Sequence, residues 1–103
     1  MTEKIQSLLL ENTVVLFMKG TPHQPYCGFS QTAVTILNAL NIPFQGVNIL
    51  EDETLRADIK KFADWPTFPM LFLNKELVGG CDIMVQMYQN GDLKSLFEKH
   101  EII

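Results

Sequence analysis

Five consecutive apolar residues, Val14–Met18, constrain the fold of this chain more than any other feature. The run has the length of a strand, and its β-branched and large side chains show no alternation with polar residues. A strand that is apolar on both faces must be covered on both sides, so we expect this run at the centre of a sheet. Like the other apolar runs, it is far too short to cross a bilayer, and no membrane partner is expected.

Helical and strand-like patterns alternate along the rest of the sequence. Strands are expected at about 13–18, 44–49, 70–73 and 76–78, and helices at about 2–11, 27–40, 52–62, 82–88 and 92–100. The segment 20–25 is expected to be a loop because it contains glycine and prolines. A right-handed parallel βαβ unit followed by an antiparallel hairpin gives a four-stranded mixed sheet with helices on both faces. This α/β arrangement is the thioredoxin-like architecture.

Particular residues define the predicted third and fourth helices. Asp52 and Asp82 are expected to cap them, and Gly91 to end the fourth. In the third helix, Leu55, Ile59 and Phe62 are expected to form the inner face. The sequence thus predicts which side of each helix meets the sheet.

Length and charge exclude several classes of protein. With 103 residues, the chain is expected to form one domain over 1–103. Twelve acidic and eight basic residues give a net charge of −4, which argues against a nucleic-acid partner. Two cysteines without an export signal point to a reducing compartment, expected to be cytoplasmic, or an organelle matrix if a transit peptide was removed.

Cys27 lies at the expected start of the second helix, after a segment that contains two prolines. Free backbone N–H groups and the positive end of the helix dipole stabilise a thiolate at such a position. A thiolate is both a nucleophile and a metal ligand, whereas the alternative is a buried, inert cysteine. His23 and His100 lack metal-ligand spacing, and two cysteines this far apart do not form a zinc site.

Three motifs, in order, resemble those of the monothiol glutaredoxins. They are Cys27-Gly28-Phe29-Ser30 with the upstream Met18–Pro22, then Trp65–Pro69, then Glu76–Asp82. The resemblance extends from about Ile5 to Phe97 and implies the glutaredoxin fold. Ser30 stands where dithiol relatives keep a resolving thiol, so no neighbour three residues away can clear a mixed disulfide at Cys27. The long segment between Lys19 and Cys27 is also similar to that of the monothiol branch.

The resemblance implies a glutathione site. Lys19 and Arg56 match positions that contact glutathione in the family, although each alone reads as a surface cation. Phe68-Pro69 resembles the family's cis-proline turn, which presents the Phe68 backbone to the ligand; the alternative is an ordinary trans turn. After Gly79 and Gly80, which permit close backbone approach, Cys81 and Asp82 open a helix N-terminus that can receive the γ-glutamyl carboxylate. Asp82 could also bind the amine.

Cys81 has three possible roles on sequence grounds. It can be a small buried side chain, a slow disulfide partner for Cys27, or only a backbone donor. The turn beside Gly80 leads us to expect that its thiol points inward.

A [2Fe-2S] cluster needs four ligands, usually thiolates. The resemblance implies a homodimer bridged by the cluster, with two Cys27 thiolates and two thiolates from bound glutathione. It further implies a cluster carrier that serves apo iron-sulfur recipients and pairs with BolA-type proteins. The alternatives are a glutathione-dependent thiol-disulfide oxidoreductase (deglutathionylation), with Cys27 as the nucleophile, and a thiol-bearing adaptor. The missing resolving cysteine and the long segment before Cys27 favour the carrier.

Overall fold

The computed structural model describes residues 2–103 and contains the expected elements in the expected order, with two short additions. The additions are a two-stranded hairpin before the second helix and one turn of 3₁₀-helix before the third. In chain order the elements are α1 (Thr2–Glu11), β1 (Val14–Met18), β2 (Gly20–Thr21), β3 (Gln24–Pro25), α2 (Gly28–Ala39), β4 (Gln45–Asn48), η1 (Ile49–Glu51), α3 (Glu53–Ala63), β5 (Met70–Leu73), β6 (Glu76–Gly79), α4 (Cys81–Asn90) and α5 (Asp92–Lys99).

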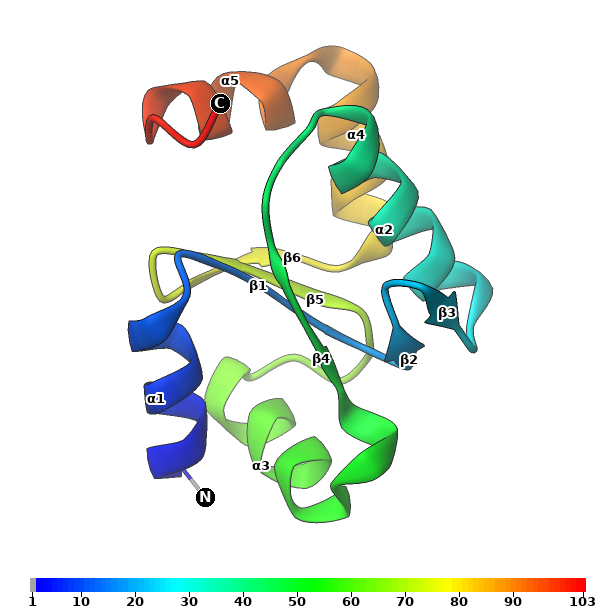
Figure 1. The fold of residues 1–103 in the computed structure, drawn as a ribbon, viewed down its shortest axis with the longest axis vertical. Coiled ribbons are helices and arrows are strands. Elements are labelled where there is room, and N and C mark those ends of the chain that lie inside the picture. The colour runs from blue at the N-terminus through cyan, green and yellow to red at the C-terminus, as the bar shows by residue number, and fades with distance from the viewer. Residues whose placement is uncertain (1) are drawn as a thin grey trace.

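The main sheet has the strand order β4-β1-β5-β6 (Figure 1). Strand β1 is parallel to β4, with Leu16 opposite Gly46, and antiparallel to β5, with Leu16 opposite Leu71. All five residues of β1 are buried. The apolar run Val14–Met18 is therefore an inner strand of a mixed sheet, as predicted from its lack of polar alternation.

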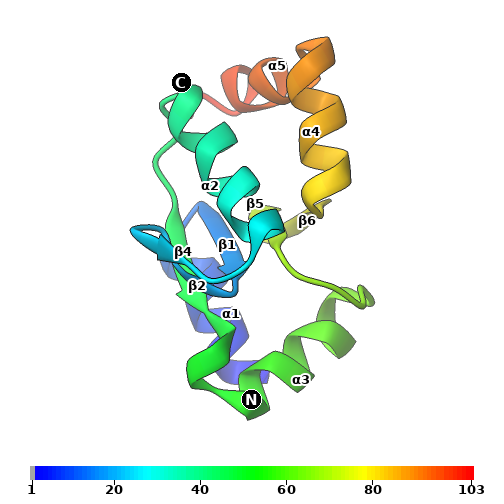
Figure 2. The ribbon, with the colours of Figure 1, turned by 90° about the vertical axis from the view of Figure 1, so that its right-hand side faces the viewer.

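Helices cover both faces of this sheet (Figures 1 and 2). One face packs against α1 and α3 around Phe17, Ile59 and Phe72, and the other against α2, α4 and α5 around Leu37, Met84 and Phe97. Burying each such side chain contributes about 1.5–3 kcal/mol. The thioredoxin-like α/β fold is confirmed. Among the described helices, none is long and apolar enough to cross a membrane.

The segment 20–25, expected to be a loop, is an ordered hairpin. Gly20 pairs with Pro25, and Thr21 with Gln24. Gly20 has a φ of 93°, and a Cβ at this position would lie 2.5 Å from the Gln24 carbonyl oxygen. Glycine is therefore required for the chain to turn back, and the same residue that indicated a loop makes the hairpin possible.

The helix ends agree in part with the sequence. The Asp52 side chain caps α3 by accepting a hydrogen bond of 2.9 Å from the Leu55 N–H, and Gly91 ends α4 with a φ of 85°, both as expected. However, the cap of α4 is Gly80, and Asp82 lies within the first turn. Leu55 and Ile59 are fully buried on the inner face of α3, as expected. Phe62 lies at the margin of that face: it is 42% exposed, but its ring centroid is 6.4 Å from that of the buried Phe72.

Candidate functional site: a cationic cleft beside the Cys27 thiol

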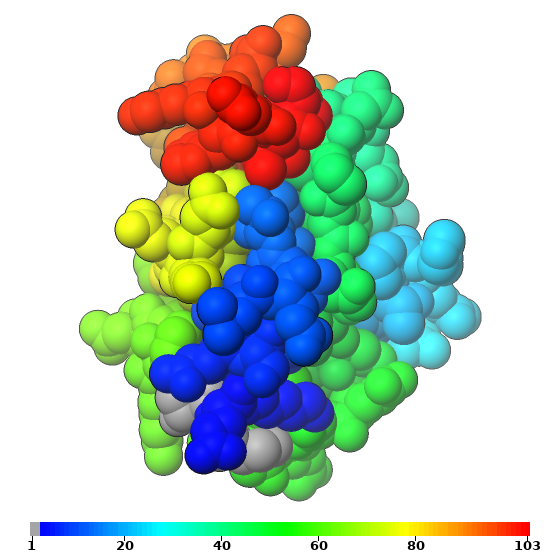
Figure 3. Space-filling view, turned by 60° about the vertical axis from the view of Figure 1, so that its left-hand side comes forward, coloured from blue at the N-terminus to red at the C-terminus, as the bar shows by residue number. Residues whose placement is uncertain are grey.

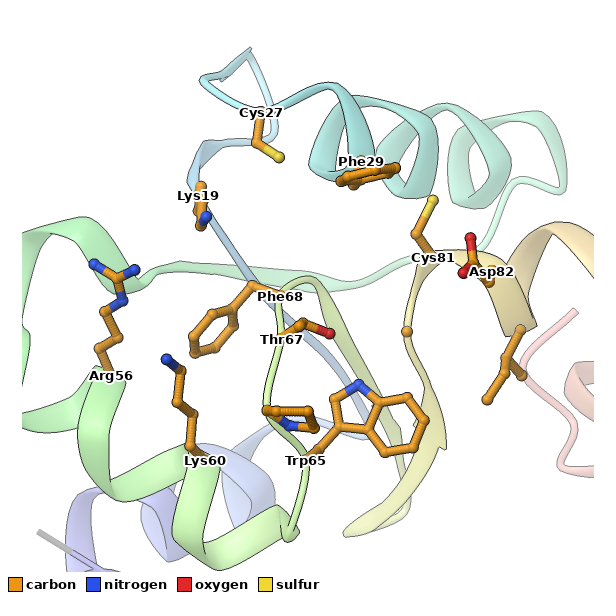
Figure 4. A pocket seen from close by; sticks show the side chains of 13 residues that line it. Lys19, Cys27, Phe29, Arg56, Lys60, Trp65, Thr67, Phe68, Cys81 and Asp82 are labelled. Atoms are coloured by element: carbon orange, nitrogen blue, oxygen red, sulfur yellow. The ribbon is translucent and has the colours of Figure 1, made fainter.

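A cleft of about 620 Å³ opens beside the start of α2 (Figure 4). Its walls come from the end of β1, the start of α2, helix α3, the segment 65–69 and the start of α4. The cleft brings together all six residues that the sequence suggested, which are Lys19, Cys27, Arg56, Phe68, Cys81 and Asp82. Residues far apart in the sequence thus meet at one place, because β1 and β6 end, and β5 begins, at the same end of the sheet.

Cys27 is the cap residue of α2, with extended backbone angles of φ −138° and ψ 136°. Its side chain does not form a cap hydrogen bond with the backbone of α2. The pKa of the thiol is nevertheless lowered, first by the backbone N–H of Ser30 and then by the N–H of Phe29 and the charge of Lys19, although desolvation opposes them. These groups stabilise a negative sulfur, so the position favours the thiolate as the sequence predicts.

Three cations face the cleft, and the sequence suggested only two of them. Lys19 follows the end of β1, whereas Arg56 and Lys60 lie one turn apart on α3. The Lys60 ammonium lies 5.8 Å from the centroid of the Phe68 ring, at a distance typical of a cation–π contact. The spacing of four residues after Arg56 is the signal that could have identified Lys60. Although the chain has a net charge of −4, these three cations give the cleft a positive local potential that attracts anions.

Two segments, 65–69 and 79–80, pack tightly against each other in another wall of the cleft. The Phe68-Pro69 peptide bond is cis, as expected. The Trp65 indole Nε1 is buried without a hydrogen-bond partner among residues 2–103, and a Cβ on Gly80 would lie 3.2 Å from it. A Cβ on Gly79, whose φ is 152°, would lie 2.7 Å from Ile83. The two glycines therefore allow the close backbone approach that the sequence predicts.

Cys81 lies in the cleft wall, and its thiol is directed into the cleft (Figure 4). The expectation that this thiol points inward is wrong, because Cys81 is the first residue of α4 and only half-buried. Its pKa is raised by desolvation and by the negative charges of Asp82 and Cys27. The two free thiols of the cleft thus have opposite ionisation tendencies.

Within the described residues, no group of three or more His, Cys, Asp or Glu side chains is placed to hold a metal ion. His23 is exposed on the hairpin turn, and the ring of His100 lies with its Nδ1 3.0 Å from Asn74 Nδ2. A metal centre on Cys27 would therefore need ligands from outside a single chain.

The sequence matches the glutaredoxin family model over residues 14–78. It is 56% identical to a probable monothiol glutaredoxin 2 of Rickettsia typhi over 94 residues, which are 91% of this chain and 85% of that protein. It is 50% identical to glutaredoxin 4 of Escherichia coli K12 over 97 residues, which are 94% of this chain and 84% of that protein.

Solved structures agree with these matches. The reduced apo form of poplar GrxS14 is 50% identical, with a TM-score of 0.85 over 95% of this chain and 90% of that chain. A truncated monomeric 1-C-Grx1 of Trypanosoma brucei is 34% identical, with a TM-score of 0.90 over 98% of this chain and 92% of that chain. A buckwheat glutaredoxin–glutathione complex, at 22% identity, a TM-score of 0.84 and coverage of 98% and 90%, shares the fold. With its relatives at 50–56% identity over most of its length, this chain belongs to the glutaredoxin family, in the monothiol branch.

Proposed function

We propose that the cleft binds glutathione, and that Cys27 and bound glutathione together hold a [2Fe-2S] cluster as cargo for transfer to apo-proteins. The observation that carries this proposal is the single thiol of lowered pKa at the edge of a cleft lined by three cations. Ser30, in place of a second thiol, is fully buried and accepts a hydrogen bond from the Lys19 N–H. The position three residues after Cys27 therefore supplies no thiol.

Glutathione has the charges that this cleft complements. The tripeptide carries two carboxylates, one ammonium and one thiol. Lys19, Arg56 and Lys60 supply cations for a carboxylate, and Arg56 can do so with two parallel hydrogen bonds. The N-terminus of α4 suits the other carboxylate, and Asp82 in its first turn suits the ammonium. The ligand thiol would then lie on the side of the cleft that Cys27 occupies.

The thiols of one chain are too few for a cluster, which usually takes four thiolates. Two chains would bring two Cys27 and two Cys81 thiols, but the raised pKa of Cys81 disfavours its thiolate. Two glutathione thiolates would complete the set of four ligands without the free energy needed to ionise Cys81. A homodimer bridged by the cluster follows, and because half of its ligands are small molecules, the cargo can leave when they dissociate.

The lowered pKa of Cys27 also favours a second candidate, glutathione-dependent reduction of mixed disulfides. The Cys27 thiolate would attack the glutathione sulfur of a protein–glutathione disulfide and release the protein thiolate. A second glutathione would then attack the Cys27–glutathione disulfide, release Cys27 and leave as oxidised glutathione. Turnover in this assay without any cluster on reconstitution would favour the oxidoreductase over the carrier.

Anaerobic reconstitution with iron and sulfide, with and without glutathione, tests the proposal. We expect a visible cluster spectrum, bound glutathione and a dimer on size-exclusion chromatography only when glutathione is present. Cys27→Ser should lose the cluster and stay folded, whereas Cys81→Ser should keep it. A cluster-bearing dimer that survives exhaustive removal of glutathione but disappears in Cys81→Ser would overturn the ligand assignment.

A further inference from the structure

The hairpin of β2 and β3 connects the central strand to the reactive thiol. It begins at Gly20, directly after Lys19, and ends at Pro25, two residues before Cys27. Its base is closed by the hydrogen bond of 3.0 Å from the Tyr26 N–H to the Lys19 carbonyl oxygen. Because the hairpin is closed in this way, a displacement of its turn would be passed to the backbone of Cys27.

The turn of the hairpin rests on the edge strand β4. Figures 2 and 3 show the hairpin, in light blue, at the side of the molecule beside the green segment that contains β4. Pro22 lies over Gly46: a Cβ built on Gly46 would be 2.5 Å from Pro22 Cγ and 2.7 Å from Pro22 Cδ. Gly46 is not among the residues with positive φ, so its backbone would accept alanine. Only the ring of Pro22 excludes a side chain there.

A second contact lies two residues along the same strand. The Asn48 Oδ1 accepts hydrogen bonds of 3.0 Å from the Gly20 N–H and of 3.0 Å from the Leu50 N–H. Positions 46 and 48 face the same side of the strand, because side chains alternate along it. One face of β4 therefore holds the hairpin both at its turn and at its base.

We infer that Gly46 is a positioning residue for Cys27. Because Gly46 has no side chain, the ring of Pro22 can lie against β4, and this contact fixes the position of the hairpin and, through it, of the thiol at the N-terminus of α2. Cys27 is the cap residue of α2 and follows the hairpin by two residues, so a shift of the hairpin moves the sulfur relative to the free N–H groups at the start of that helix. Gly46 itself touches no reacting group. The inference rests on Cys27 being the reactive thiol, which is part of the proposed function.

Alkylation kinetics measure the position of the thiol. In a Cys81→Ser background, Cys27 is the sole thiol, and its rate with iodoacetamide as a function of pH reports the thiolate fraction. Gly46→Ala should slow alkylation several-fold near neutral pH and move the pH profile upward. The rate at high pH, where the thiol is fully ionised, should not fall, because a thiolate of higher pKa is at least as nucleophilic. Pro22→Ala combined with Gly46→Ala should restore the profile, because the ring that meets the added methyl group is gone.

Gly28→Ala is the matched control, since a Cβ there meets nothing within 4 Å. It should leave the profile close to that of the parent protein. A normal profile in Gly46→Ala, or a shift that Pro22→Ala does not relieve, would overturn the inference. If circular dichroism shows that Gly46→Ala does not fold, the variant with both Pro22→Ala and Gly46→Ala decides. A folded protein with the parental pH profile supports the inference, and a second failure to fold refutes it. The measurement needs neither glutathione nor iron, so it stands apart from the cluster assignment.

Discussion

The Ser30 hydroxyl accepts a hydrogen bond of 3.1 Å from the Lys19 backbone N–H and so joins the first turn of α2 to the end of β1. The Ser30 side chain is fully buried. The position that would hold a resolving thiol in a dithiol relative is therefore a structural contact between the two elements that carry the thiol and one of its cations.

Ser30→Ala should destabilise the protein by about 1–3 kcal/mol, because the Lys19 N–H would lose its partner in a mostly buried position. Urea unfolding measures this change. Thr32→Ala is the matched control: it removes a hydroxyl from the same helix, but its bond to the Gly28 carbonyl oxygen is exposed, so we expect a change within about 0.5 kcal/mol. Equal stability losses in the two variants would show that the Ser30 contact has no special weight.

Arg56→Ala and Lys60→Ala should each weaken glutathione binding. A charge-assisted contact contributes about 1.5–3 kcal/mol when shielded from water, and partial exposure of these side chains reduces this to a several-fold loss of affinity. Isothermal titration calorimetry measures the loss, which should shrink at high salt because the attraction is screened.

Lys61→Ala is the control for the two cleft cations. It removes the same charge from an exposed position of α3 that does not line the cleft. Its glutathione affinity should match that of the unmodified protein. If Lys61→Ala weakens binding as much as Lys60→Ala, general charge and not the cleft geometry attracts the ligand.

Asp52 should make the stability of the protein depend on acid pH. The pKa of its carboxyl is lowered, first by the hydrogen bond of 2.7 Å from the Lys4 ammonium and then by the Leu55 N–H. A lowered folded-state pKa adds stability above the usual aspartate range, and this stability is lost as pH falls through the lowered pKa.

The variant Asp52→Asn isolates this charge. Asparagine keeps the side-chain oxygen that caps α3, so chiefly the ion pair with Lys4 is removed. The urea midpoint of the variant should fall less steeply than that of the unmodified protein when the solution is acidified. Asp92→Asn removes a carboxylate from the first turn of another helix, α5, so its urea midpoints as a function of pH serve as the control for the loss of one negative charge. Parallel acid profiles for unmodified protein and Asp52→Asn would contradict the assignment.

Local sequence rules predicted the features that depend on neighbouring residues. The buried inner strand followed from the uninterrupted run Val14–Met18, and the ends of helices followed from Asp52 and Gly91. The site residues could be proposed because Cys27 has a helix start beside it and because the motifs resemble a family. In the first two cases the sequence pattern that decided the prediction lies within a few positions of the residue concerned, whereas the resemblance supplied the distant site residues.

Features that depend on distant partners could not be predicted in this way. The hairpin is held by Gly46 and Asn48, which lie more than twenty positions beyond its turn. Lys60 has a local signal, its spacing of four residues after Arg56, but its contact with the ring of Phe68 depends on how α3 lies against the segment 65–69. The direction of the Cys81 thiol depends on where α4 begins. We expected Asp82 to cap this helix, but the cap is Gly80, so Cys81 is the first residue of the helix.

The two thiols of the cleft should react in a fixed order. The pKa of Cys27 is lowered by the N–H groups at the start of α2 and by Lys19, whereas that of Cys81 is raised by desolvation, Asp82 and Cys27. Near neutral pH, Cys27 therefore has the larger thiolate fraction, and alkylation requires the thiolate. A short pulse of iodoacetamide followed by peptide mass spectrometry should show the label first on Cys27. Because the negative charge of Cys27 contributes to the raised pKa of Cys81, Cys27→Ser should make Cys81 react faster than it does in the unmodified protein. Label that reaches Cys81 first, or a Cys81 rate that falls in Cys27→Ser, would contradict this coupling of the two thiols through their charges.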